Sequence, residues 1–274
     1  MRNKILVLGS TGKTGRRVTE QLQRLQILFI AGSRNGKPSF NWEDASNWQQ
    51  VLKDVETVYI TFQPDLAMPG STEKISLFVQ HAKQANVKKL VLLSGRGEKE
   101  AGRCEQVIIN SGLNWVVVQS SWFMQNFSER FLLDAVLNNE ILLPEIKVLE
   151  PFIDVDDLAE MIVKVLINDK YDKQVYEATG PELLSFKTAA ALIATGTKRK
   201  ISYTEMDMEA YAALLRSFML PESYTWLIQY LFSEVLDGRN EFITNDVEKI
   251  LNRKPITFAA YVDKTLKTGI WNMQ

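Results

Sequence analysis

Three glycines near the start of the chain have the spacing of a nucleotide-binding turn. Gly9, Gly12 and Gly15 stand at equal intervals in the stretch "LVLGSTGKTGRRV", and a Gly-Lys-Thr triplet lies among them. A glycine-rich turn between a strand and a helix lets backbone N–H groups come close to phosphate oxygens. Two kinds of chemistry use such a turn: hydrolysis of a nucleoside triphosphate, and binding of a dinucleotide.

The spacing favours the dinucleotide. A hydrolase loop needs a glycine five residues before the Gly-Lys-Thr triplet, and that position is Val7, inside an apolar run. A dinucleotide turn needs glycines for a tight turn, for close approach of the backbone to the pyrophosphate and for packing of the helix on the strand. We therefore expect the pyrophosphate to be held by the whole loop: Gly9, Ser10, Thr11, Gly12, Lys13, Thr14 and Gly15.

The end of the second apolar run predicts which dinucleotide binds. An NAD site usually carries Asp or Glu there, bonded to the ribose 2′-hydroxyl. The stretch "ILFIAGSRNGK" (27–37) has no carboxylate and carries Ser33 and Arg34 instead. A hydroxyl and a guanidinium suit a 2′-phosphate. The sequence therefore predicts NADP(H) as the cofactor.

The elements that must position this turn are short apolar runs that alternate with helical patterns. Runs that are apolar throughout indicate strands buried on both faces of a sheet, and the alternation is typical of an α/β doubly wound parallel sheet, the Rossmann fold. The expected strands are residues 4–9, 27–33, 57–62, 89–95 and 114–120. We expect the NADP-binding domain over 1–121 and 148–180, and a smaller, mostly helical substrate lobe over 122–147 and 181–274.

Ligands of such sheets bind at the carboxyl ends of the strands. Cofactor contacts are therefore expected after two further strands, at Thr61, Phe62, Gln63, Ser94 and Gly95. After the strand 114–120, the segment "SSWFMQNF" offers aromatic and amide groups for a flat substrate, namely Trp122, Phe123, Met124, Asn126 and Phe127. The same side chains also suit a buried packing surface, and both interpretations stay open.

Composition excludes several other classes of protein. The formal net charge is −1 with no basic block, which argues against binding to a nucleic-acid backbone. No stretch of about 18 apolar residues predicts a membrane span. One cysteine and one histidine argue against a disulfide framework and a metal site, and suit the cytoplasm. We expect a small-molecule substrate; the aromatic residues between 224 and 232 are typical of a lobe core or of a homodimer surface.

Several segments carry a family resemblance over nearly the full length. They include "VLGSTGKTGRRV" (7–18), "SSWFMQNFSE" (120–129) and "PFIDVDDLAE" (151–160), with "FNWEDASNW" (40–48) and "GPELLSF" (180–186) as more specific matches. The chain resembles the NmrA-like branch of atypical short-chain dehydrogenases, and within it the reductases of ergot-alkaloid pathways and their bacterial relatives. The resemblance implies a Rossmann domain, NADP(H), and either reduction of a small organic substrate or redox sensing without turnover.

The chain departs from the wider dehydrogenase pattern at the proton donor. Those enzymes carry a tyrosine and, four residues later, a lysine that protonate a carbonyl oxygen; aligning on "EQVIINSGL" (105–113) puts Gly97 and Ala101 there. Neither residue moves a proton, so no catalytic residue is assigned. We expect an oxidoreductase that transfers hydride to a small aromatic or heterocyclic acceptor, of the quinone or imine/iminium type. The alternatives are a non-catalytic NADP(H)-binding redox sensor and, disfavoured by the missing tyrosine, an epimerase or lyase.

Overall fold

The computed structural model describes residues 4–272 and separates into two compact units. The first unit consists of Met1–Ser120, Val155–Ala178 and Asp246–Arg253, and the second of Ser121–Asp154, Thr179–Asn245 and Lys254–Gln274. These boundaries differ from the expected ones: residues 148–154 lie in the second unit, and residues 246–253 lie in the first.

The first unit is built on a six-stranded parallel sheet in the order β2-β1-β3-β4-β5-β7. Its central strands are fully buried apolar runs, as the sequence predicts for a sheet covered on both faces. The strands are β1 (Ile5–Leu8), β2 (Phe29–Gly32), β3 (Thr57–Ile60), β4 (Lys89–Gly95), β5 (Asn114–Ser120) and β7 (Gln174–Ala178).

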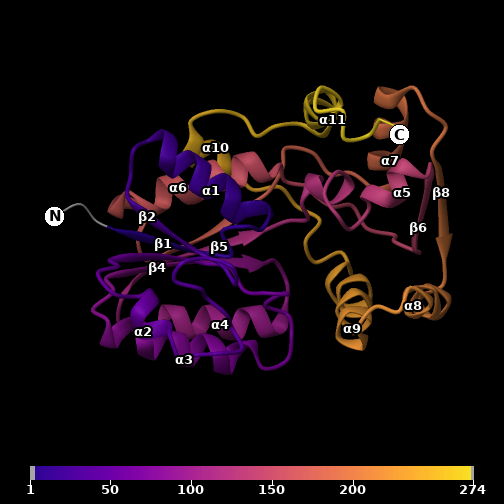
Figure 1. Cartoon of the computed structure of the whole chain (residues 1–274). Coiled ribbons are helices and arrows are strands. Elements are labelled where there is room, and N and C mark those ends of the chain that lie inside the picture. Colours follow the sequence, from indigo (N-terminus) through magenta and orange to yellow (C-terminus); the bar gives the residue numbers. More distant parts are fainter. Residues whose placement is uncertain (1–3, 273–274) are drawn as a thin grey trace. The chain divides into compact units, whose positions relative to one another are not determined.

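Helices cover both faces of this sheet (Figure 1). On one face lie α1 (Lys13–Arg24), α6 (Val155–Leu166) and α10 (Asp246–Leu251), and on the other lie α2 (Trp48–Val51), α3 (Ser71–Gln84) and α4 (Lys99–Ile109). A short 3-10 turn, η2 (Asp169–Tyr171), precedes β7. The predicted doubly wound α/β fold is confirmed.

The order of the strands determines where a ligand can bind. The chain runs from β1 outward to β2, then returns to pair β3 on the other side of β1. Open α/β sheets take their ligands at such a reversal, which here lies at the carboxyl ends of β1 and β3. The glycine turn follows β1 directly.

Helix α10 belongs to the first unit, although we expected the whole tail after residue 181 in the smaller lobe. The backbone N–H of Glu177 in β7 donates to Asp246 Oδ2 over 3.1 Å. Just beyond the helix, Arg253 pairs with buried Asp157 of α6 over 2.7 Å. These contacts join segments about 70 and 100 residues apart in the chain, which a local sequence pattern does not report.

The second unit is mostly helical, and it also contains a two-stranded parallel sheet that the sequence analysis did not predict. Strands β6 (Glu140–Pro144) and β8 (Ser202–Met206) pair across some 60 residues, and β8 is largely exposed. The helical elements are η1 (Met124–Phe127), α5 (Leu133–Leu137), α7 (Phe186–Thr197), α8 (Met208–Ser217), α9 (Glu222–Tyr230), the π-helical turn η3 (Leu231–Val235) and α11 (Phe258–Leu266).

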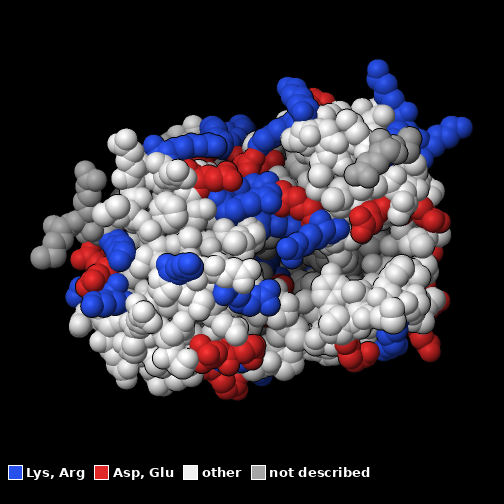
Figure 2. Space-filling model, viewed as in Figure 1, with Lys and Arg blue, Asp and Glu red and all other residues white. Residues whose placement is uncertain are grey.

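Charged side chains of both signs are interspersed over the face of the molecule drawn in Figure 2. Among residues 4–272, no helix combines the length and the apolar character that crossing a membrane requires.

Candidate functional site

The glycine turn after β1 is closed so tightly that two of its positions accept no side chain. Gly9 has φ +65°, and a β-carbon there would lie 2.1 Å from Thr61 Oγ1. A β-carbon on Gly15 would lie 2.2 Å from the backbone oxygen of Gly9. The N–H of Gly12 donates to that same oxygen over 2.8 Å and closes the turn.

Helix α1 begins at this turn without a side-chain cap. Its N-cap is Gly12, so no hydroxyl or carboxylate of the cap residue accepts a bond from the first turn of the helix. The N-terminal end of a helix carries a partial positive charge and attracts anions. A turn that glycine keeps open, joined to an uncapped helix, fits the pyrophosphate of a dinucleotide.

Hydroxyl groups near the turn bond to the backbone and to one another. Ser10 Oγ donates to the backbone oxygen of Gly32 over 3.2 Å, and Thr61 Oγ1 donates to that of Leu8 over 3.0 Å. Thr14 Oγ1 accepts a 3.0 Å bond from the hydroxyl of Tyr59. Sequence reasoning missed Tyr59, because it stands inside a buried strand 45 residues away. The other loop members differ: Thr11 is exposed and Lys13 is half-buried.

The side-chain amide of Gln63 lies beside the turn. A β-carbon placed on Gly9 or on Gly12 would come within 3.8 and 3.9 Å of Gln63 Nε2. Gln63 is therefore the member of the 61–63 segment whose side-chain amide lies near both Gly9 and Gly12. Its neighbour Phe62 packs instead on Trp42, with 4.9 Å between ring centroids.

Ser33 and Arg34 follow β2 in a tight turn. The backbone oxygen of Ser33 accepts from Gly36 N over 3.0 Å and from Phe40 N over 2.8 Å. The Arg34 side chain is exposed, and within residues 4–272 no carboxylate pairs with it. An unpaired guanidinium at the end of β2 is placed to receive a 2′-phosphate.

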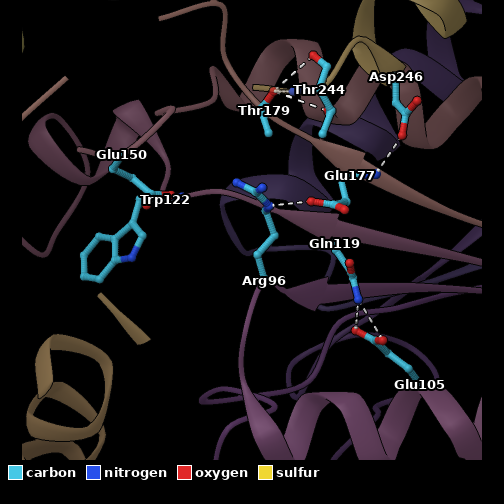
Figure 3. Close-up of polar contacts among 9 residues, drawn as sticks. All are labelled: Arg96, Glu105, Gln119, Trp122, Glu150, Glu177, Thr179, Thr244 and Asp246. Carbon is cyan, nitrogen blue, oxygen red and sulfur yellow. Dashed lines mark hydrogen bonds and ion pairs between the residues drawn. The ribbon is translucent and has the colours of Figure 1, made fainter. Parts of the chain in front are cut away.

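At the end of β4, the side chain of Ser94 faces helix α4. Ser94 Oγ donates to Glu105 Oε1 over 2.5 Å. Gln119 Nε2, from β5, donates to both oxygens of the same carboxylate over 3.0 and 2.8 Å (Figure 3). Glu105 is 6% exposed, so these donors stabilise a buried carboxylate. Ser94 can therefore contact a cofactor only through its backbone atoms.

The residues after Ser94 form a rigid, polar corner. Arg96 is buried, and its Nε donates to Glu177 Oε2 over 2.9 Å, which ties β4 to β7 (Figure 3). Gly97 has φ +75°, a region that a tyrosine side chain adopts only with strain. Ala101 is fully buried in α4. Neither position aligned with the dehydrogenase relay is suited to a tyrosine or lysine facing a ligand.

Two of the five residues expected to line a substrate are core residues. Met124 and Phe127 are 1% and 0% exposed, and Phe127 packs on Phe152 and Phe258 with centroid distances of 6.0 and 5.6 Å. Side chains enclosed by their own unit have no surface to offer a ligand, so the packing interpretation holds for these two.

The other three residues of the segment, Trp122, Phe123 and Asn126, are half-buried. Trp122 packs edge-on against Phe186 and Phe232, each 5.3 Å away. Its backbone N–H donates to Glu150 Oε1 over 3.1 Å (Figure 3).

Known proteins resemble this chain over nearly its whole length. Agroclavine dehydrogenase of Claviceps fusiformis is 27% identical, over 98% of this chain and 99% of that protein. An NAD(P)H azoreductase of Xenophilus azovorans is 25% identical, over 94% and 96%. The chain is thus similar in sequence to agroclavine dehydrogenase and to bacterial oxidoreductases. These relatives confirm the resemblance inferred from the sequence.

The fold is shared with solved structures at lower identity. An NADPH-dependent quinone oxidoreductase from Escherichia coli, solved with NADPH, superposes with a TM-score of 0.81 at 17% identity, covering 96% of this chain and 99% of that one. No protein-family model matches the chain.

Proposed function

We propose that this protein is an NADP(H)-dependent oxidoreductase that transfers hydride to a small aromatic or heterocyclic acceptor, of the quinone or imine/iminium type. The observation that carries the proposal is the turn at residues 9–15: contacts of 2.1 and 2.2 Å require glycine at positions 9 and 15, and the turn opens an uncapped helix. Arg34 stands just after β2 in place of a carboxylate and has no ion-pair partner within the described residues 4–272, which supports NADP(H) over NAD(H).

Different residues of the chain bind different parts of the cofactor and the acceptor. The N–H groups at the start of α1 hold the pyrophosphate, Gln63 lies beside it, and Arg34 pairs with the 2′-phosphate. When bound, NADPH supplies a hydride. Trp122, Phe123 and Asn126 are our candidates for contacting the acceptor, since they keep partly exposed surface. Their contribution would be to orient the acceptor and to exclude water.

The relatives support this class of acceptor. They include a protein named for agroclavine, one named for azo compounds and one named for quinones. An iminium carbon accepts hydride without needing a proton, which suits a chain whose aligned relay positions are glycine and alanine.

The decisive experiment is a turnover screen. Purified protein with NADPH is mixed with quinones, azo dyes and cyclic iminium ions, and the absorbance of the reduced cofactor is followed. Turnover with any of these classes supports the reductase. Tight NADPH binding with no turnover across the panel supports the second candidate, a redox sensor. A protein that binds neither NADPH nor NADH contradicts both.

A further inference from the structure

Two carboxyl groups meet at the carboxyl edge of the sheet. Asp65 lies in the loop after β3, and Glu98 directly precedes α4, which follows β4. Glu98 folds back over the end of β4, so that its Oε1 lies 2.0 Å from the point that a β-carbon on Gly95 would occupy. The carboxyl groups of Asp65 and Glu98 lie close enough for each to shift the pKa of the other.

Two carboxyl groups at such close range are compatible when one of them carries a proton. Oε2 of Glu98 is buried, and no donor group of the described residues 4–272 bonds to it. A carboxylate oxygen beside a second carboxylate is repelled, whereas a carboxyl O–H between the two satisfies both. The pair is therefore expected to hold one shared proton.

The surroundings of Glu98 favour its neutral form. Burial, and after it the charge of Asp65, raise the pKa of Glu98 well above its usual range; Glu105 of α4 acts in the same direction. Burial also raises the pKa of Asp65, which accepts a 2.9 Å bond from Ala67 N. Among residues 4–272, no lysine, arginine or histidine forms an ion pair with Glu98 that would oppose these effects.

The position of the pair relates it to the reaction. A dinucleotide lies across the switch point of the sheet, with its two halves over opposite sides. Arg34 at the end of β2 marks the adenosine half. The other half then extends over the ends of β3 and β4, which carry Asp65 and Glu98.

We propose that Glu98 is the proton donor for acceptors that need a proton in addition to a hydride. The inference rests on the proposed function and deepens it. For a quinone, hydride from NADPH adds two electrons and one hydrogen, and the resulting oxyanion takes the proton of Glu98. The O–H bond of the carboxyl breaks, its electron pair stays on the carboxylate, and a new O–H bond forms on the hydroquinone.

Asp65 and Glu98 are both half-buried, so water can reach the pair. A proton from water can therefore return to the pair after each turnover.

The test compares two classes of acceptor in the same variant. Glu98→Gln keeps the shape of the side chain and removes its acid. We expect it to lower kcat for quinones or azo dyes by about 100-fold or more, in the range typical of a lost general acid, while a cyclic iminium ion is reduced at close to the native rate. Glu100→Gln is the matched control, since Glu100 lies two residues after Glu98, in the first turn of α4, but pairs with Thr72 and Arg103. It should leave both rates unchanged.

The pH profile gives a second signature. With a quinone, the rate should fall as pH rises through the pKa of Glu98. With the iminium ion, this falling limb of the pH–rate profile should be absent. Asp65→Asn removes one of the groups that raise that pKa, so the limb should move to lower pH. A profile that is the same for both acceptors overturns the proposal.

A readout without turnover completes the test. Infrared spectra of the cofactor-free proteins are compared at neutral pH. The native protein should show a protonated carboxyl band that is absent from Glu98→Gln and present in Glu100→Gln. If the band is unaffected, or if Glu98→Gln slows both acceptors equally, the inference fails. Failure of the proposed function looks different, because then the native protein reduces no acceptor of any class.

Discussion

Oε1 of Glu98 occupies the space above Gly95, 2.0 Å from where a β-carbon on that glycine would stand. The glycine therefore leaves room for the carboxyl group. Since the obstructing atom is the far end of a flexible side chain, an added methyl group would displace Glu98 and leave the backbone of β4 in place.

This relationship predicts the effect of Gly95→Ala. The variant should fold, and its turnover of quinones or azo dyes should fall while reduction of a cyclic iminium ion persists, because the acid is moved and not removed. Steady-state kinetics with the two acceptors measures the ratio. Equal losses with both acceptors would show that the methyl group acts on binding of the cofactor instead.

Arg34 should determine the preference between the two dinucleotides. Arg34→Ala loses a charge-assisted contact to the 2′-phosphate, which is worth about 1.5–3 kcal/mol, or roughly 10- to 150-fold in the dissociation constant of NADPH. Affinity for NADH should not change. Titration of both cofactors by fluorescence measures this, with Arg24→Ala as a control, since Arg24 is an exposed arginine at the last turn of α1. Equal affinities of the native protein for NADPH and NADH would contradict the prediction.

Gly12 should be required by both cofactors alike. Its backbone φ is −79°, and a β-carbon there meets the backbone oxygen of Gly9 at 3.2 Å, so a larger side chain mainly obstructs the phosphate position. Gly12→Val should weaken NADPH and NADH by a similar factor, on the order of 10-fold or more if one charged hydrogen bond is lost.

A helix glycine without such contacts provides the comparison. Gly102, in α4, has open space around its Cβ position, so Gly102→Ala should raise the free energy of unfolding by about 0.4–1 kcal/mol and leave cofactor binding unchanged. Intact binding in Gly12→Val would place the dinucleotide elsewhere.

The raised pKa of Glu98 should make stability depend on pH. A carboxyl whose pKa is raised in the folded state favours folding while it is protonated, and this contribution is lost as pH rises from the unfolded pKa through the folded one. Relative to Glu98→Gln, the native protein should lose stability over that interval, by at most about 1.4 kcal/mol per pH unit for one proton. Urea unfolding of both proteins across weakly acidic and neutral pH gives the difference. A constant difference would mean that the carboxyl group is not held protonated by the fold.

The sequence by itself determined the features that depend on neighbours along the chain. Apolar runs of strand length, helical periodicity and the spacing of Gly9, Gly12 and Gly15 are local patterns, and they predicted the α/β fold and the turn. They did so because a glycine turn between a buried strand and a helix has few physical alternatives.

Tertiary structure alone decided the contacts between distant segments. Asp65 and Glu98 are brought together because β3 and β4 are adjacent and end at the same edge. Met124 and Phe127 proved to be core because aromatic residues more than 20 and 100 positions away enclose Phe127. Helix α10 joined the first unit through Asp246 and β7. In each case the partner lies far along the chain. The residues next to a position in the sequence do not indicate which distant segment the fold will place beside it.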